Sequence, residues 1–348
     1  MELFQTIQSS DHEQVLYCHD SATGLKAIIA LHDTTPGRAM GATRLWPYTD
    51  EANALQDVLR LSRSMTDKAT CANIPVGGAK GVIITHPEAK TDALLKAYAR
   101  FVDSLGGRFV TGQDVNLSAQ DVRTMNQITN HVVGVHEKGG GPAIATAQGV
   151  LLGITAAVEF RWQSPTLKGL KVAVQGLGNV GQALCHYLSE QGAQLFVSDL
   201  DSQKTAWIQQ RYQATVVPAS QITALDVDVF SPCALGGVIN QSTLPSIKAP
   251  IIAGCANNQL ANTDRDAALL KQQEILYCPD FVINAGGLIN VYHELIGYQT
   301  ARVNNHIHGI YDTLLEIFNC ARDTNISTVE AAQQVASTRR IQNQHRTA

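Results

Sequence analysis

The chain has 348 residues, a length that predicts two domains at roughly 150 residues each. Hydrophobic residues make up 45% of it and charged residues only 16%, so it can bury large cores and has apolar surface left for contacts between subunits. Lys and Arg total 26 against 30 Asp and Glu, a net charge of −4 without long runs of either sign, which argues against a nucleic-acid or anionic-membrane partner. Apolar residues and glycine occur along the whole length, which excludes a disordered chain.

The sequence shows no sign of export, membrane insertion or metal binding. We find no apolar run near the ~20 residues that a bilayer span requires, and the N-terminus lacks the basic and apolar regions of a secretory signal. Seven cysteines are widely scattered without a Cys-x-x-Cys pair, and eleven histidines include no His-x-x-x-His. We therefore expect free thiols, no bound metal and a cytoplasmic protein.

The first half of the chain predicts an α/β domain that lacks a dinucleotide fingerprint. Apolar runs at 27–32, 81–85 and 108–111 are typical of buried strands. Apolar residues recur at helical spacing over 50–66, and residues 91–104 also predict a helix.

The second half predicts a parallel sheet with helices on both faces. Gly139–Pro142 is the strongest punctuation in the chain and predicts the domain boundary. Helices are predicted at 182–191 and from Leu288 to the mid-330s. The predicted strands lie at 171–175, 195–199, 227–230, 250–253, 275–278 and 281–284. Strands that alternate with helices imply a doubly wound fold. We therefore expect a first domain over 1–138, a Rossmann domain over 139–304, and C-terminal helices over 305–348 that pack back on the first domain.

A Gly-x-Gly-x-x-Gly motif follows the strand 171–175 and opens a helix. Gly176 makes the tight turn, Gly178 allows a pyrophosphate to approach the backbone, and Gly181 packs the helix against the strand. The N-terminus of the helix that follows supplies N–H groups and a positive dipole, and Asn179 and Val180, which lie just before it, are further cofactor-binding candidates. Asp199 ends the next strand, where it can accept both hydrogen bonds of an adenosine ribose and would repel a 2′-phosphate. The motif predicts NAD; the alternative is a glycine-rich turn without a ligand.

The first half contains two lysines around a glycine-rich segment that we interpret as a turn. Lys80 lies within Pro75–Gly81, and Lys68 follows the helix predicted before it. Two lysines in a charge-poor chain favour a carboxylate-binding site, although a single lysine would be read as a solvated cation. Asp114 follows a strand end, where sites of α/β proteins form; the alternative is that it caps a helix near residue 118.

The motifs described above occur together in a known protein family. The chain resembles the Glu/Leu/Phe/Val amino acid dehydrogenase superfamily over nearly its whole length. The matching segments are His32–Thr35, Met40–Arg44, Met65–Lys68, Gly77–Lys80, Asp114–Val115, Gly176–Gly181, Pro232–Gly236, Ala256–Leu260 and Asn284–Asn290. Within the superfamily it is most similar to the leucine dehydrogenase branch, and there to the cyanobacterial tryptophan dehydrogenases. The segments that favour this closer match are Ala72–Pro75, Thr111–Asn116, Arg161–Ser164 and Gly286–Tyr292.

The resemblance implies roles for the candidate residues. Lys68, helped by the backbone of Gly41, would hold the substrate carboxylate, and Asn258 would orient the substrate. Lys80 would be the general base that activates water, and Asp114 would take and return protons at the amino nitrogen. Burial and the neighbouring Lys68 could lower the pKa of Lys80 far enough for a base.

The resemblance also assigns the cofactor and pocket positions. Thr146 would bind the nicotinamide carboxamide, and the residues near the nicotinamide ribose would be Cys233, Ala234, Leu235, Ala256 and Asn257. Met40 is a plausible pocket wall. The chain departs from its relatives at Gly112–Gln113, where glycine would make room for a wide side chain, and at Asp67, an acid that could weaken the lysine pKa shift.

The expected protein is thus a two-domain α/β enzyme with its active site in the cleft between a substrate-binding and oligomerisation domain and an NAD-binding Rossmann domain. The resemblance implies NAD-dependent oxidative deamination of an L-amino acid, with tryptophan and indole-3-pyruvate as the first candidates, in a homodimer rather than an octamer. Leucine, valine or phenylalanine remain alternative substrates. A catalytically silent NAD-binding oligomer also remains, although Lys68, Lys80 and Asp114 argue against it.

Overall fold

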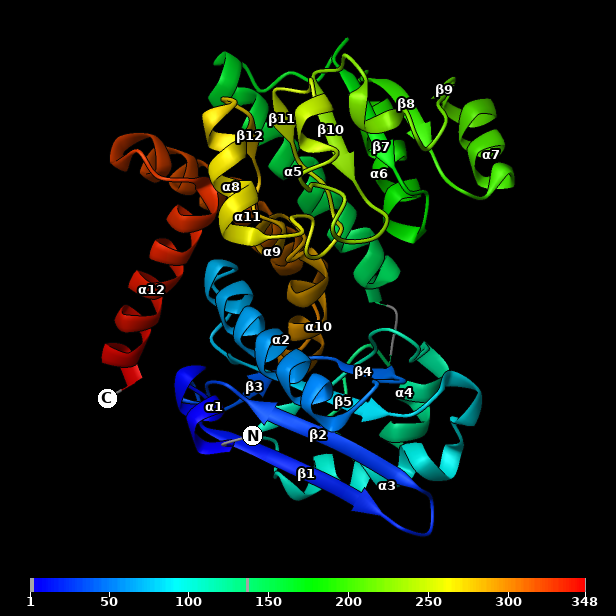
Figure 1. The fold of residues 1–348 in the computed structure, drawn as a ribbon, viewed down its shortest axis with the longest axis vertical. Helices are drawn as coiled ribbons and strands as arrows, with labels where there is room; N and C mark the ends of the chain where they lie inside the picture. The colour runs from blue at the N-terminus through cyan, green and yellow to red at the C-terminus, as the bar shows by residue number, and fades with distance from the viewer. Residues whose placement is uncertain (1–2, 136–137, 348) are drawn as a thin grey trace. The chain divides into compact units, whose positions relative to one another are not determined.

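The computed structural model describes residues 3–135 and 138–347, and its chain divides into two compact units (Figure 1). The first unit contains residues 1–138, 294–297 and 336–348, and the second contains residues 139–293 and 298–335. Each unit has its own sheet.

The first unit is built on a mixed six-stranded sheet. Its strands are β1 (Gln14–Asp20), β2 (Leu25–Leu31), β3 (Ala39–Met40), β4 (Thr43–Trp46), β5 (Gly77–Ile84) and β6 (Phe109–Val110). Their order is β1-β2-β5-β3-β6. Strand β4 also pairs with β5, at residues 81–84, whereas β3 pairs with residues 77–78 of the same strand. The β1–β2 and β2–β5 pairs are antiparallel, whereas β3 and β4 run parallel to β5. This arrangement makes β5 the strand from which both β3 and β4 extend.

Helices cover both faces of this sheet. They are α1 (Leu3–Ser9), α2 (Glu51–Cys71), α3 (Asp92–Ser104), α4 (Ala119–Asn126) and the short 3₁₀ helix η1 (Pro87–Ala89). Alternate residues of β2 separate two cores, because Ile28 packs with the α2 residues and Ile29 with those of α3. The side chain of Asp50 caps α2, and the side chain of Thr91 caps α3.

The segment Gly77–Lys80 is strand and not the turn that its glycines suggested. A Cβ on Gly78 would lie 2.2 Å from the backbone nitrogen of Thr66, and a Cβ on Gly41 would lie 1.5 Å from the carbonyl oxygen of Ala79. The glycines therefore allow α2 and β3 to approach β5 closely. The prediction of a turn was wrong because close packing, like a turn, selects glycine.

The second unit contains a parallel six-stranded sheet. Its strands are β7 (Lys171–Gln175), β8 (Gln194–Ser198), β9 (Thr215–Val216), β10 (Val229–Pro232), β11 (Ile251–Ile252) and β12 (Leu276–Tyr277). The order β12-β11-β10-β7-β8-β9 is that of a Rossmann sheet, with the first strand, β7, beside the point where the strand order reverses. This confirms the predicted fold class, an α/β protein with a mixed N-terminal sheet and a parallel Rossmann-like sheet.

The helices that complete the chain are as follows. They are α5 (Gly141–Trp162), α6 (Asn179–Glu190), α7 (Ser202–Tyr212), α8 (Thr263–Gln272), α9 (Asp280–Ile283), α10 (Gly286–Ile296), α11 (Thr300–Thr324) and α12 (Thr328–Thr347), with 3₁₀ helices η2 (Lys138–Gly140), η3 (Ile222–Ala224) and η4 (Leu244–Ser246). The strand predicted at 281–284 is instead α9. A four-residue apolar run is too short for periodicity to distinguish helix from strand, and here a turn beginning at Asp280 buries Val282 and Ile283.

The C-terminal helices differ from the expectation that residues 305–348 pack on the first domain. Helix α11 belongs to the second unit and packs along α5. A Cβ on Gly149 would lie 2.7 Å from Cδ1 of Ile310, and a Cβ on Gly153 would lie 2.9 Å from Cδ1 of Leu314. Glycines of α5 therefore let α11 approach closely. Residues 336–348 group with the first unit, where Arg339 donates to the carbonyl of Cys71 at 2.8 Å.

Helix α5 is long and apolar enough to cross a membrane by length and composition, a feature that the sequence analysis missed. Half of its most apolar window is buried, and the helix packs against α6 and α11 within the second unit. The core helix of a folded domain has the same composition as a membrane span, so we interpret α5 as a core helix.

Candidate active site

A buried ion pair joins Lys80 and Asp114 in the first unit. Lys80 lies on β5 with its side chain 7% exposed, and its Nζ is 2.9 Å from Oδ2 of Asp114. The pairing of strands places Lys80 on the same sheet face as Gly78 and Val82, which is the face covered by α2. The structure thus brings the two predicted catalytic residues into contact.

The ion pair continues into a longer network through Arg44 on β4. The Nε of Arg44 is 3.1 Å from the same Oδ2 of Asp114, and its Nη1 is 2.9 Å from Oδ2 of Asp57 on α2. The hydroxyl of Tyr48 also donates to Oδ2 of Asp57, at 2.6 Å. One guanidinium therefore links the carboxylate that faces Lys80 to a second carboxylate on α2.

The two members of the ion pair have shifted pKa values. Burial lowers the pKa of Lys80 below its usual value, against the opposing attraction of Asp114. Burial also disfavours the ionised form of Asp114, but Lys80 and Arg44 outweigh that effect and hold the pKa of Asp114 below its usual value. A lysine that gives up its proton beside an ionised carboxylate can act as a general base.

Asp114 is not a helix cap. The N-cap of α4 is Ser118, whose side chain accepts from the backbone of Asp121 in a capping box. The alternative reading of Asp114 as a cap is therefore wrong, and its carboxylate instead faces Lys80 and Arg44.

The remaining first-unit candidates lie on the elements around Lys80. Lys68 is half-buried near the C-terminal end of α2, and Met40 on β3 is 2% exposed. The backbone N–H of Gly41 donates to the carbonyl of Val110 at 3.1 Å, so this amide is already engaged. Met40 pairs with Gly78 and with Val110, which puts its side chain on the α2 face, as for Lys80.

Gly112 continues the strand beyond β6. Thr111 forms a bridge with Val132, and Gln113 forms one with Thr43, so the backbone between them is extended. The alternation of side chains then places residue 112 on the α2 face of the sheet. A Cβ there would lie 3.1 Å from the carbonyl oxygen of Val133, a tight but not impossible fit.

Sequence reasoning missed the contact of Arg44 with Asp114. Arg44 belongs to a segment that carried the resemblance, and an arginine on a strand of a charge-poor chain is the signal that could have drawn attention to it. Burial raises the pKa of Asp67, and the charges that face Asp67 are Arg63 and Arg340. The acid that faces Lys80 is Asp114.

The glycine motif of the second unit has the predicted geometry. Gly176 has φ 99°, and a Cβ there would lie 2.7 Å from the backbone nitrogen of Ala234. A Cβ on Gly181 would lie 2.0 Å from the carbonyl oxygen of Gly176, so α6 packs directly on the turn. A Cβ on Gly178, the N-cap of α6, would meet nothing within 4 Å. The space beside Gly178 and the N–H groups of Asn179–Val180 fit a pyrophosphate.

Asp199 follows β8 and is positioned by backbone amides. Its Oδ2 accepts from the N–H of Leu177 at 2.6 Å, and its Oδ1 accepts from the N–H of Asp201 at 2.9 Å. Burial disfavours its charge, but these amides outweigh burial and lower its pKa. An ionised carboxylate tied to the glycine turn fits the ribose of a dinucleotide.

The loops after β10 and β11 carry the other cofactor candidates. Cys233 and Ala234 follow β10, while Ala256, Asn257 and Asn258 follow β11. The backbone N–H of Gly237 joins the two loops by donating to the carbonyl of Asn258 at 2.7 Å. Oδ1 of Asn257 accepts from Nδ2 of Asn284 at 2.6 Å.

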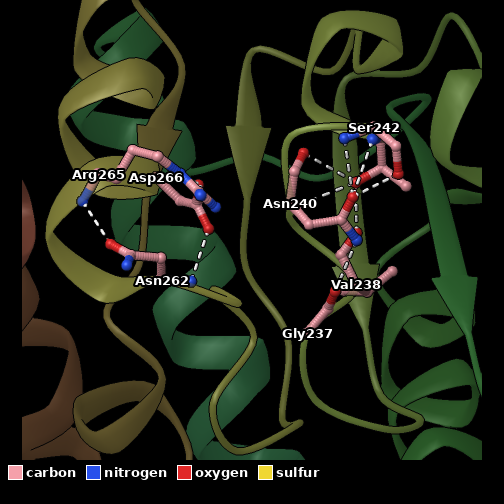
Figure 2. Close-up of polar contacts among 8 residues, drawn as sticks. Gly237, Val238, Asn240, Ser242, Asn262, Arg265 and Asp266 are labelled. Atoms are coloured by element: carbon pink, nitrogen blue, oxygen red, sulfur yellow. Dashed lines mark hydrogen bonds and ion pairs between the residues drawn. The ribbon is translucent and has the colours of Figure 1, made fainter.

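Side-chain amides hold these two loops in shape (Figure 2). Oδ1 of Asn240 accepts from the N–H of Ser242 at 2.9 Å, while its Nδ2 donates to the carbonyl of Gly237 at 2.8 Å. Asn262 caps α8 by accepting from the N–H of Arg265 at 3.0 Å, and its own N–H donates to Asp266 at 2.8 Å. Hydrogen bonds within the protein therefore stabilise both loops.

Thr146 lies in the first turns of α5. Its hydroxyl donates to the carbonyl of Pro142 at 2.8 Å, which leaves the oxygen able to accept from an amide. A Cβ on Gly287 would lie 2.8 Å from this oxygen, so glycine there keeps α10 close to Thr146.

Comparison with known proteins covers nearly the whole chain. The model of the Glu/Leu/Phe/Val dehydrogenase dimerisation domain matches residues 12–138, and that of Glutamate/Leucine/Phenylalanine/Valine dehydrogenase matches residues 139–205 and 196–347. An L-tryptophan dehydrogenase of Nostoc punctiforme is 59% identical over 339 residues, which cover 97% of this chain and 96% of that protein. A leucine dehydrogenase of Geobacillus stearothermophilus is 44% identical over 343 residues, covering 97% and 93%.

A solved structure agrees with these matches. The crystal structure of L-tryptophan dehydrogenase from Nostoc punctiforme has a TM-score of 0.88 and 55% sequence identity, covering 98% of this chain and 99% of the other. Enzymes of this family use NAD or NADP, and a dimerisation domain implies a homo-oligomer. The chain belongs to the Glu/Leu/Phe/Val dehydrogenase family and is an amino acid dehydrogenase.

Proposed function

We propose that the enzyme catalyses the reversible, NAD-dependent oxidative deamination of L-tryptophan to indole-3-pyruvate and ammonia. The observation that supports tryptophan as the substrate is the 59% identity to an L-tryptophan dehydrogenase over nearly the full length of both chains. The observation that supports the chemistry is the contact of 2.9 Å between buried Lys80 and Asp114.

The proposed mechanism divides the work among three residues. Lys68 binds the substrate carboxylate through a charge-assisted hydrogen bond, with help from the backbone of Gly41. Asp114 accepts a proton from the substrate ammonium, so that the nitrogen lone pair can form the imine as Cα loses its hydride. The nicotinamide, when bound, supplies the acceptor for that hydride.

Hydrolysis of the imine completes the reaction. Lys80, in its neutral form, takes a proton from the water that attacks the imine carbon. Asp114 then returns its proton to the nitrogen. As the C–N bond breaks and ammonia leaves, the ionised Asp114 takes the hydroxyl proton of the carbinolamine, and the carbonyl of the 2-oxo acid forms. Asn258 is proposed to orient the substrate during these steps.

The cofactor in this proposal is NAD rather than NADP. Gly176, Gly178 and Gly181 would hold the pyrophosphate against the start of α6, and Asp199 would accept hydrogen bonds from the adenosine ribose. Thr146 would accept from the nicotinamide carboxamide. The loops of Cys233–Leu235 and Ala256–Asn257 would contact the nicotinamide ribose.

Met40 and Gly112 are the proposed determinants of the indole pocket. Both lie on the sheet face that carries Lys80, and the flexible thioether of Met40 suits an aromatic ring. Gly112→Ala would add a methyl group to a position already within 3.1 Å of Val133. We expect kcat/KM for tryptophan relative to leucine to fall roughly 5- to 150-fold, the equivalent of the usual 1–3 kcal/mol cost of overpacking.

The matched control for Gly112→Ala is Gly309→Ala, because an added Cβ on Gly309 of α11 meets nothing within 4 Å. The control should keep the ratio of the two kcat/KM values. An unchanged ratio in Gly112→Ala would remove this residue from the proposed pocket.

The deciding experiment is a panel of L-amino acids assayed for NADH formation by the wild-type enzyme. Tryptophan should give the highest kcat/KM. A preference for leucine, valine or phenylalanine would contradict the proposed substrate but leave the proposed reaction in place. If no amino acid gives NADH, the protein would instead be a catalytically inactive NAD-binding oligomer.

We also propose that the enzyme is a cytoplasmic homodimer rather than an octamer. All seven cysteines are free thiols, which is typical of a reducing compartment. Light scattering of the purified protein would give the mass of the assembly, and a mass of eight subunits would contradict the dimer.

A further inference from the structure

Asp114 holds two cations through a single oxygen. Lys80 and Arg44 both contact Oδ2, at 2.9 Å and 3.1 Å, and Oδ1 takes part in neither contact. The side chains of Arg44 and Asp114 are each 21% exposed, so water screens these interactions only in part. Both cations therefore contact the same oxygen of the carboxylate.

We infer that Arg44 is a positioning residue for the Lys80–Asp114 pair, anchoring Oδ2 of Asp114 so that Oδ1 is presented to the amino nitrogen of the substrate. This inference rests on the proposed function for the role of Asp114, but not for the role of Arg44 toward Lys80.

The need for such a residue follows from the chemistry of Lys80. A general base must lose its proton before it can work, and neutral Lys80 would no longer hold Asp114 by charge. Arginine keeps its charge at every pH at which the enzyme can function. Arg44 therefore keeps Asp114 ionised and in place when Lys80 is neutral.

Arg44 is itself fixed from its other end. Its Nη1 contacts Oδ2 of Asp57 at 2.9 Å, and the Tyr48 hydroxyl donates to the same oxygen at 2.6 Å. A planar guanidinium that bridges two carboxylates through different nitrogens has a set orientation, which an ammonium in its place could not reproduce.

The charges around Lys80 predict the effect of Arg44 on its titration. The charged and titratable groups on the elements packed around Lys80 include Arg44 on β4, Tyr48 after it, the α2 residues Glu51, Asp57, Arg60, Arg63, Asp67 and Lys68, Asp114 after β6, and His32 after β2. Burial lowers the pKa of Lys80 most, Asp114 raises it, and Arg44 lowers it. Without Arg44, Asp114 would act on Lys80 undiminished, and the pKa of Lys80 would rise.

Two substitutions separate charge from geometry. Arg44→Gln removes both, so the acidic limb of the kcat/KM profile should move to higher pH by about one unit, since Lys80 must be neutral to act. Arg44→Lys keeps the charge but loses the bridge to Asp57. The acidic limb of the kcat/KM profile of Arg44→Lys should stay near that of the wild type. Its kcat should fall about tenfold or more, with little change in KM.

A measurement without substrate tests the same point. The rate at which acetic anhydride acetylates Lys80, followed by mass spectrometry across pH, reports the fraction of neutral amine directly. Arg44→Gln should shift this titration to higher pH by a similar amount. The control is Arg60→Ala, which removes an exposed arginine that also contacts Asp57, at 2.9 Å, and should leave both the profile and the labelling curve in place.

The outcomes are distinguishable from failure of the proposed function. If the wild type oxidises no amino acid, the proposed function fails, and the labelling curve still decides the effect of Arg44 on Lys80. If Arg44→Gln does not fold, Arg44→Lys decides. Equal pH profiles, labelling curves and kcat values in the variants and the wild type would show that Arg44 only ties β4 to α2.

Discussion

At the scale of single residues, the chemistry depends on the pKa values of Lys80 and Asp114, which burial and neighbouring charges shift in opposing ways. Burial drives Lys80 toward its neutral form, while two cations keep Asp114 in its charged form. One residue of the pair is therefore prepared to accept a proton from water and the other to accept one from an ammonium group.

Lys80→Ala should lower kcat by a factor on the order of 10²–10⁴, because it removes the general base. Lys68→Ala should raise KM as well, because it removes a contact present in the ground state. Initial rates at saturating and limiting amino acid give the two parameters. Near-normal turnover of Lys80→Ala at alkaline pH would place the base elsewhere.

Asp199→Asn should narrow the preference for NAD over NADP, because it removes the charge that repels a 2′-phosphate. Its amide oxygen can still accept from one of the backbone N–H groups that Asp199 now engages. The measurement is kcat/KM for each cofactor in the wild type and the variant. Comparable values for the two cofactors in the wild type would contradict the assignment of NAD.

At the scale of elements, α5 and α11 pack closely because glycines remove side chains from their contact. A Cβ on Gly153 would lie 2.4 Å from Cγ1 of Ile283 and 2.9 Å from Cδ1 of Leu314, and both of these side chains are fully buried. Gly309, on α11, has open space at its Cβ position. Substituting alanine at each of the two glycines therefore separates the effect of side-chain packing on stability from the effect of helix propensity.

Gly153→Ala and Gly309→Ala should change stability in different directions. Both gain roughly 0.5–1 kcal/mol in helix propensity, but Gly153→Ala also incurs an overpacking cost of about 1–3 kcal/mol. Gly309→Ala should raise the Tm, and Gly153→Ala should have the lower Tm of the two. Thermal unfolding by circular dichroism gives both values, and equal Tm shifts would show that the side chains of Ile283 and Leu314 can move aside.

Elements were predictable from the sequence where their pattern was long. The run Lys171–Gln175 before the glycine motif predicted β7 to the residue, and the helical spacing over 50–66 predicted most of α2. The segments at Gly77–Lys80 and 281–284 were misread because glycine serves both turns and close packing, and because four apolar residues carry no period. Contacts such as Arg44 with Asp114 join residues far apart in sequence, and no local pattern encodes them.

At the scale of the whole molecule, buried histidines link stability to pH. His32 is 2% exposed, and its Nδ1 lies 2.7 Å from Oγ1 of Thr66, which in turn accepts from the N–H of Gly78 on β5. Burial lowers the pKa of His32 from 6.5 to about 4. The folded first unit therefore holds His32 neutral under conditions in which an unfolded chain would bind a proton.

Stability should consequently fall with acid. The folded pKa lies below the unfolded one, so the contribution of His32 is complete above pH 6.5 and is lost as the pH falls toward 4. We expect about 2 kcal/mol of this loss between pH 7 and pH 5. Urea unfolding at the two pH values would measure it, and His32→Gln should show a smaller difference than the wild type. An equal difference in the variant would assign the acid sensitivity to other groups.

The pairing of α5 with α11 also bears on how the chain is synthesised. Helix α5 ends at Trp162, and its partner α11 begins only at Thr300. On a ribosome, the surface of α5 at Gly149 and Gly153 thus leaves the exit tunnel long before α11, whose Ile310 and Leu314 lie against it. Apolar surface that waits for its partner during synthesis is prone to aggregation, so the order of α5 and α11 in the chain exposes this surface for the time that about 140 residues take to be added.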